Sequence, residues 1–162
     1  AEGYGIHFRS SDITNAFVNS GTITGTATAS ISGGTSSASA TAYGLLIDSG
    51  STFGSLTNSG TVSATATADS SDVTGTTATA NAQAYAIEIN GAATDPGAIS
   101  NTGTVTASAT ATADGDSGVA TANAYGFFIN NTANLTGGLS NSGTISATAS
   151  ATAARRASNL LS

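Results

Sequence analysis

Polar and apolar positions alternate strictly over the longest regular segments of the chain. Between Thr61 and Ala68, the odd positions carry Thr or Ser and the even positions carry Val or Ala. The same alternation starts at Thr22, Thr104 and Thr144. A period of two predicts half-buried β-strands, and the β-branched threonines favour strand over helix. We therefore expect strands that turn alanines inward and hydroxyl side chains outward.

Three short motifs divide the chain into four repeats. The first reads Asn, Ser or Thr, Gly, Thr, and its copies follow each other at steps of 39, 43 and 40 residues. Its four copies begin at Asn19, Asn58, Asn101 and Asn141. The second motif is a large apolar residue two positions earlier, at Phe17, Leu56, Ile99 and Leu139. The third is a tyrosine that opens an apolar segment, at Tyr4, Tyr43, Tyr85 and Tyr125. A period of 20 to 50 residues indicates a solenoid, a propeller or a repeat array.

Repeat and alternation together predict an all-β fold for residues 1–162, which we take as one β-solenoid domain. The expected architecture is a right-handed parallel β-helix with about four coils of roughly 40 residues. Equivalent residues would stack about 4.8 Å apart, so each repeat asparagine would hydrogen-bond to its copies. The alanine strands would pair face to face as a flattened arm rich in Ala and Thr. Two short coils of about 20 residues per repeat are the alternative within this class.

The tyrosine segments require a change of direction. Ile87 shares a parity with Tyr85, whereas the alanines before them have the opposite parity. Ala84 and Tyr85 are neighbours, so both can point inward only at a bend, and we expect a corner or bulge there. We expect the tyrosines to line a triangular core with the Ile, Leu, Val and Phe anchors. The glycine after each repeat asparagine is expected to supply a backbone conformation that other residues resist.

The phrase Leu/Ile-x-Asn-Ser-Gly-Thr-Ile, followed by Tyr-Gly-Ile-x-Ile, resembles the β-helix passenger of autotransporter proteins of Gram-negative bacteria. The resemblance spans nearly the whole chain. It implies a secreted or cell-surface protein, outside the bacterial cell at the outer membrane, with a structural or adhesin role. Neighbouring coils of a longer chain, or a host or surface glycan or receptor, are the implied partners. The chain departs from the family in its longer coil and in lacking a translocator barrel, so we expect a passenger fragment.

Composition excludes several other classes of function. Ala, Thr, Ser and Gly fill 104 of 162 positions, charged residues make up 7%, and the net charge is −6. Three arginines and no lysine cannot neutralise a phosphate backbone, so we expect no nucleic-acid partner. No run approaches the roughly 20 apolar residues of a membrane span, so direct membrane insertion is not expected. The absence of cysteine removes disulfides, zinc–thiolate sites and cysteine nucleophiles.

Residues that carry chemistry are few. His7 is the only histidine, and no nucleophile, histidine and acid recur together around it. We therefore expect no catalysis and no cofactor. Calcium is the one ion that the pattern suggests, through carboxylates of two equivalent loops, with solvated turn residues as the plainer interpretation. These carboxylates are Asp69 and Asp72 in one loop and Asp114 and Asp116 in the next.

The outward threonines and serines suggest a second possible function. Stacked in register, they would form a flat lattice of hydroxyl groups, about 6.7 Å apart along the strands and 4.8 Å across them. Such a lattice resembles the threonine ladders of ice-binding β-solenoids, and binding to ice or to a crystalline polymer is an alternative to simple solubility. The lattice would include Thr24, Thr26, Thr65, Thr67, Thr106, Thr110 and Thr148.

The ends of the repeat array suggest a third possible function. A β-helix leaves unpaired backbone groups on its terminal coils, and repeat proteins normally cover these with capping elements. The sequence shows no clear capping helix at either end. Self-association end to end, into an extracellular fibre, is therefore a further alternative to a longer solenoid.

Overall fold

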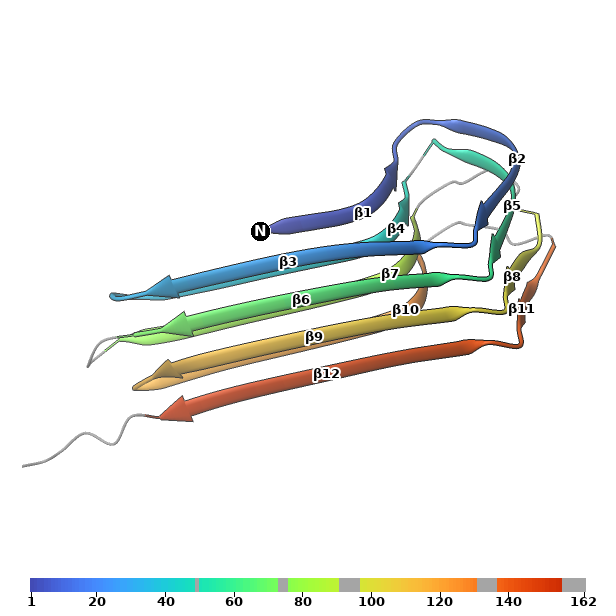
Figure 1. Ribbon diagram of the computed structural model, residues 1–162. Coiled ribbons are helices and arrows are strands. Elements are labelled where there is room, and N and C mark those ends of the chain that lie inside the picture. Colours follow the sequence, from blue (N-terminus) through green and yellow to red (C-terminus); the bar gives the residue numbers. More distant parts are fainter. Residues whose placement is uncertain (49, 73–75, 91–96, 131–136, 156–162) are drawn as a thin grey trace, which may run out of the picture.

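The computed structural model describes residues 1–48, 50–72, 76–90, 97–130 and 137–155, and these residues form β-strands without any helix. The part of the chain that is described accordingly contains no helix able to cross a membrane. All strand pairs are parallel, and the strands form three sheets of four. Figure 1 shows the three sheets wound into one solenoid.

Each sheet collects every third strand of the chain. The Tyr sheet contains β1 (Glu2–Phe8), β4 (Ser36–Ile47), β7 (Thr77–Asn90) and β10 (Ser117–Asn130). The short sheet contains β2 (Asp12–Asn19), β5 (Thr52–Asn58), β8 (Ile99–Asn101) and β11 (Leu139–Asn141). The Thr sheet contains β3 (Thr22–Ser32), β6 (Thr61–Ser71), β9 (Thr104–Gly115) and β12 (Thr144–Arg155).

One repeat makes one coil. Thr61 pairs with Thr22 on one side and with Thr104 on the other, so partners lie a full repeat apart. Three turns lead from β1 to β10, and β11 and β12 continue the fourth coil. In Figure 1 the chain runs behind along β1, crosses the short sheet and returns in front along β3, one coil lower each time. This winding is right-handed. The prediction of a right-handed β-helix is therefore confirmed, and coils of about 20 residues are ruled out.

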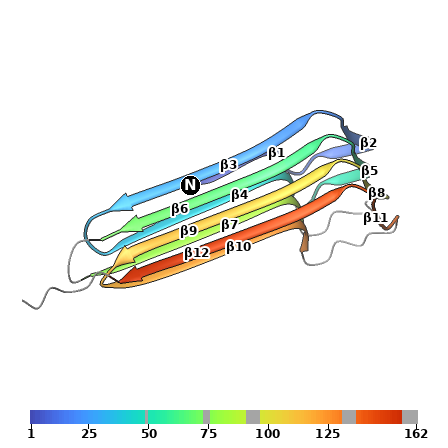
Figure 2. The ribbon, with the colours of Figure 1, turned by 60° about the horizontal axis from the view of Figure 1, so that its bottom comes forward.

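Two of the sheets approach closely to form a long flat arm. Figure 2 shows the Thr sheet lying over the first halves of β4, β7 and β10 along the whole arm. Alanines fill the space between them, and Ala40, Ala66 and Ala82 have no exposed surface. At Gly25 the sheets are so close that a Cβ would overlap the carbonyl oxygen of Tyr43. The arm is the predicted Ala/Thr arm, held by small side chains that admit close packing.

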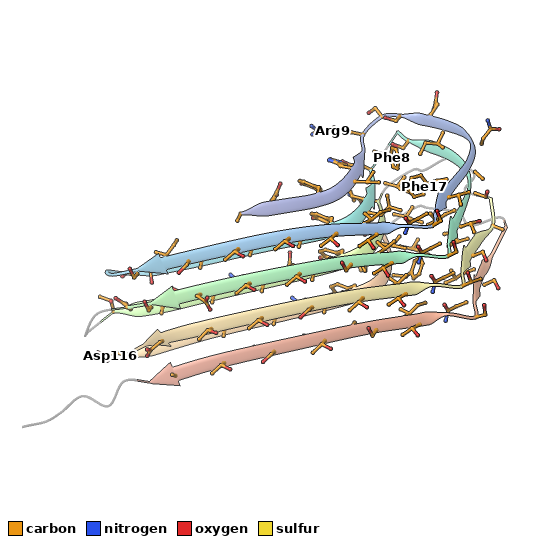
Figure 3. All side chains as sticks on the ribbon, viewed as in Figure 1. Phe8, Arg9, Phe17 and Asp116 are labelled. Atoms are coloured by element: carbon orange, nitrogen blue, oxygen red, sulfur yellow. The ribbon has the colours of Figure 1, made fainter. Side chains whose placement is uncertain are left out.

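Larger apolar residues fill a triangular section at the other end of each coil. In the second and third coils Leu45, Leu56 and Ile87 are at most 1% exposed. In the first coil, Phe8 and Phe17 meet edge to face with ring centroids 5.5 Å apart. Figure 3 shows both rings inside the upper end of this section, whereas Arg9 points away from it. The core therefore consists of the predicted Ile, Leu, Val and Phe anchors.

The tyrosines do not belong to this core, which corrects the prediction that they line it. Tyr4 is 39% exposed and Tyr43 is half-buried, whereas Gly44 lies inward against Val62 of the Thr sheet. Gly44 and Leu45 are the neighbours that both point inward, so the bend falls one residue later than the sequence suggested. The tyrosines keep the outward parity and occupy the outer side of this bend.

The repeat glycines also act differently from expectation. Gly60 and Gly103 are not among the residues with positive φ, which in the described chain are Ser10, Gly33, Gly34, Gly50 and Gly138. A Cβ on Gly60 would instead overlap the carbonyl oxygen of Gly21 in the coil above. Glycine is required at this corner because successive coils approach too closely for a side chain.

Candidate functional site

The predicted asparagine ladder runs along one corner of the solenoid. Asn19, Asn58 and Asn101 each donate from Nδ2 to Oδ1 of the asparagine in the next coil, at 2.7 Å in all three steps. Asn58 and Asn101 are at most 1% exposed. Neighbouring backbone carbonyls accept further hydrogen bonds from the same amides, as Gly60 does from Asn58. The ladder ends at Asn141, and it thus satisfies buried polar groups that would otherwise be costly.

The backbone of the same corner is hydrogen-bonded in the opposite direction. The N–H groups of Ser59 and Gly60 both donate to the carbonyl of Asn19 in the coil above, at 2.8 and 3.1 Å. The pattern recurs between the second and third coils and between the third and fourth. The side-chain amides thus donate downward and the backbone amides upward, which gives the stack a fixed polarity.

The four tyrosines form a second ladder on the outer side of the bend. Consecutive rings stack with centroids 5.0–5.2 Å apart and planes within 11° of parallel. Tyr4 donates a hydrogen bond to Glu2 at 2.7 Å, and this bond together with partial burial raises the pKa of Tyr4. Burial also raises the pKa of Tyr43 and of Tyr85. These three phenols are therefore neutral at physiological pH. Stacking covers the ring faces between neighbouring tyrosines of the ladder.

A buried carboxylate lies beside the tyrosine ladder. Glu88 points to the outer side of β7, in register with Leu46 and Phe128, yet it is only 6% exposed. Its Oε2 atom accepts no hydrogen bond from the described residues. Burial, with a smaller contribution from the nearby charge of Asp48, raises the pKa of Glu88 to about 7. This carboxyl group therefore changes its charge close to neutral pH.

A third ladder follows the end of the Tyr sheet, and the sequence analysis missed it. Asn130 donates to Asn90 at 3.2 Å, and Asn90 donates to Asp48 at 3.4 Å. Asp48 also lies 3.4 Å from Nε2 of His7 in the first coil. Each of the three follows the last isoleucine of its strand, and that recurrence could have revealed them. The sequence analysis did not recognise this recurrence because the residue type changes between copies, with Arg9 in the first.

The outer face of the Thr sheet carries the predicted hydroxyl lattice. Register places Thr26, Thr65, Ser108 and Thr148 in one column across the four coils. Cross-coil hydrogen bonds join neighbouring rows: one links the hydroxyls of Thr24 and Ser63 at 3.0 Å, and in another Ser146 donates to Thr106 at 3.3 Å. Figure 3 shows the side chains standing in rows along the four strands. All seven predicted lattice threonines lie on this face: Thr24, Thr26, Thr65, Thr67, Thr106, Thr110 and Thr148.

The calcium candidates lie near the tip of the arm. The backbone N–H of Asp72 donates to the carbonyl of Asp114 at 2.8 Å, and Thr76 donates to the Asp72 carboxylate. Asp69 faces outward from β6, and Figure 3 labels Asp116 at the arm tip. Within the described ranges, no three acidic or histidine side chains come close enough to hold a metal ion. The geometry therefore adds no support to the calcium hypothesis.

No protein-family model matches the chain, and no curated protein or solved structure does so either. Fold and surfaces define a parallel β-solenoid repeat protein with a flattened arm.

Proposed function

We propose that the chain is a non-catalytic structural and adhesive segment of a secreted or cell-surface bacterial protein, similar to an autotransporter passenger. The observation that carries the proposal is the uniform repetition of the coil. The asparagine ladder, the tyrosine ladder and the Thr/Ser face continue through all four coils with the same kinds of residue at the same register. A rod of this kind presents long repetitive surfaces, which suit support and multivalent contact.

The distribution of reactive groups supports a non-catalytic role. His7 and Asp48 lie together at the end of the Tyr sheet, and no third acidic, histidine or cysteine side chain joins them among the described residues to form a metal-type cluster. Glu88 is buried, 6% exposed, in register with Leu46 and Phe128 of the neighbouring coils. The exposed faces offer hydroxyl and amide groups, which donate and accept hydrogen bonds as glycans do.

Adhesion can be tested with the purified chain attached to beads. We expect saturable binding to at least one member of a panel of surface glycans and matrix proteins, without turnover of any of them. Thr65→Lys on the hydroxyl face should weaken glycan binding, and Thr121→Lys on the opposite face of the arm is the matched control. Hydrolysis of a panel member by the wild-type chain, or absence of all binding, would contradict the proposal.

A second candidate function is binding to ice or to a crystalline polymer, because the hydroxyl face is flat and regular. Its rows are about 4.8 Å apart and alternate residues about 6.7 Å apart, and the first four columns contain only Thr and Ser. A repeating solid surface can match such spacings over many sites at once.

Thermal hysteresis and pull-down with crystalline chitin or cellulose test this candidate. Activity should fall strongly in Thr65→Tyr, because a bulky ring breaks the flat lattice at its centre. Thr121→Tyr carries the same ring on the other face and should keep full activity. Equal loss in both variants, or no activity in the wild type, argues against a lattice-binding function.

A further inference from the structure

The fourth coil exposes core positions that the inner coils bury. Val105 has no exposed surface, whereas Ile145, at the same position in β12, is 38% exposed. Ile99 is likewise fully buried, whereas its partner Leu139 is 47% exposed. The lower end of the solenoid therefore presents an open apolar section of the size and shape that another coil covers.

Before Arg155, the last residue of β12, the same end carries no charge. Residues 117–154 contain no Asp, Glu, Lys, Arg or His. Exposed edge strands are normally protected against pairing by charges, proline, bulges or a covering segment. Along Thr144–Ala154, β12 keeps an unbroken register with β9, and the described residues place no strand on its other edge. Such an edge favours the addition of a further parallel strand.

The polarity of the corner selects which strand fits. At the fourth coil, Asn141 offers the Nδ2 donor and a backbone carbonyl toward the open side. At the first coil, Asn19 Oδ1 accepts from the N–H of Gly21 at 3.2 Å and has a second lone pair for another donor, and the N–H of Ser20 offers a donor, as its equivalents do within the stack. Head-to-tail contact pairs donors with acceptors. Contact between two fourth-coil ends would instead place the Nδ2 donors of two Asn141 side chains against each other.

We propose that the chain binds a second copy of itself head to tail, with the open edge of β10–β12 pairing in parallel with the open edge of β1–β3. The register would place Asn141 against Asn19 and Ile145 against Ile23. Phe17 of the second copy would cover Leu139 of the first, which joins two apolar sections. The interface is heterologous and does not close, so it continues into an unbranched filament.

A glycine in the first coil provides a sharp test. A Cβ on Gly60, Gly103 or Gly143 would overlap a glycine carbonyl of the coil above, whereas a Cβ on Gly21 meets nothing within 4 Å. In the proposed filament Gly21 takes the place that Gly60 has inside the chain. Gly21→Ala should therefore leave the single molecule intact and clash with the carbonyl of Gly143 in the next copy.

The experiment combines sedimentation velocity, light scattering and negative-stain microscopy of the full chain at rising concentration. We expect masses in whole multiples of 15.4 kDa and unbranched rods. Gly21→Ala should weaken association at least about tenfold with unchanged circular dichroism. Asn141→Asp keeps the acceptor for Asn101 but replaces the outward donor by a carboxylate, so it should weaken association similarly. Ser37→Ala, exposed on β4, is the control and should assemble as the wild type does.

Several outcomes would overturn the proposal. A wild-type chain that stays monomeric has no self-complementary ends. Dimers that never grow indicate contact between identical ends, and flat sheets that persist in Gly21→Ala indicate lateral contact through the hydroxyl face. If Gly21→Ala fails to fold, Asn141→Asp alone decides: unchanged rods in that variant refute head-to-tail pairing.

Discussion

At the scale of single residues, the asparagine ladder explains why one residue type recurs at this corner. An amide group carries both a donor and an acceptor, so each side chain can receive a hydrogen bond from one coil and pass another to the next. Asn58 does both, at 2.7 Å on each side, while it is 1% exposed. An aspartate could only accept, and a leucine could do neither.

Replacing an inner ladder residue should be costly. We predict that Asn58→Ala lowers the free energy of unfolding by about 2–4 kcal/mol, because Asn19 and Asn101 each lose a buried partner. Asn141→Ala, at the exposed end of the ladder, should cost less than about 1.5 kcal/mol. Urea unfolding followed by circular dichroism measures both variants, under conditions that keep the chain monomeric. Equal losses would show that the ladder does not depend on burial.

Glu88 should make stability depend on pH. Its pKa rises from 4.5 to about 7 in the folded chain, because burial penalises the charged form. The folded chain therefore binds the proton of Glu88 more tightly than the unfolded chain does. The stabilisation from this bound proton is complete below pH 4.5 and is lost as the pH rises through 7. We predict that this loss is up to about 3 kcal/mol between pH 4 and pH 8.

Chemical denaturation across that pH range measures the effect. Glu88→Gln should unfold at nearly constant denaturant concentration and should be more stable than the wild type at pH 8. Asp69→Asn, a partly exposed carboxylate on the outer face of β6, should keep the wild-type slope. A wild-type profile that is flat or rises from pH 4 to pH 8 would contradict the assignment.

At the scale of strands, the arm shows how far small side chains determine a sheet-to-sheet contact. Ala66 on β6 and Ala40 on β4 are both fully buried between the Thr and Tyr sheets. Alanine methyl groups determine the distance between the sheets, so the packed space has no room for additional methylene groups.

Enlarging one inward alanine should therefore separate the sheets. We predict that Ala66→Leu lowers the free energy of unfolding by about 3 kcal/mol or more, because overpacking strains both strands. Thr65→Leu adds an isobutyl group to the neighbouring exposed position and should change stability by less than about 0.5 kcal/mol. Thermal unfolding of the two variants separates them. A small effect at Ala66 would mean that the arm is loosely packed.

Sequence reasoning predicted the strands, their register and the arm, because periods of two and of about 40 residues are local and countable. It misplaced the tyrosines, because the side that a residue faces after a bend depends on which peptide turns. Gly44 lies inward against Val62, and its equivalent Ala86 in the third coil is fully buried, so the bend follows the tyrosine in both coils. It also missed the Asp48–Asn90–Asn130 ladder, because hydrogen bonding there tolerates a change of residue type.

At the scale of the whole molecule, stability should grow with the number of coils, because each coil contacts its immediate neighbours. Duplicating residues 77–116, one full register step from Thr77 to Ser117, inserts a third-coil copy without breaking a ladder. We predict a higher urea midpoint and an m-value about one quarter larger. Equilibrium unfolding of the duplicated chain measures both. An unchanged m-value would show that the added coil does not join the cooperative unit.

The constant step between paired strands also governs how the chain folds. Each strand must find a partner about 40 residues away, so closing the first coil is slow and costs considerable chain entropy. Once two coils have docked, every later strand meets a template that is already in place. Folding time should then be set by one nucleation event followed by rapid growth, and total length should hardly alter it. A chain that emerges gradually, one end first, can fold in the same order in which it appears.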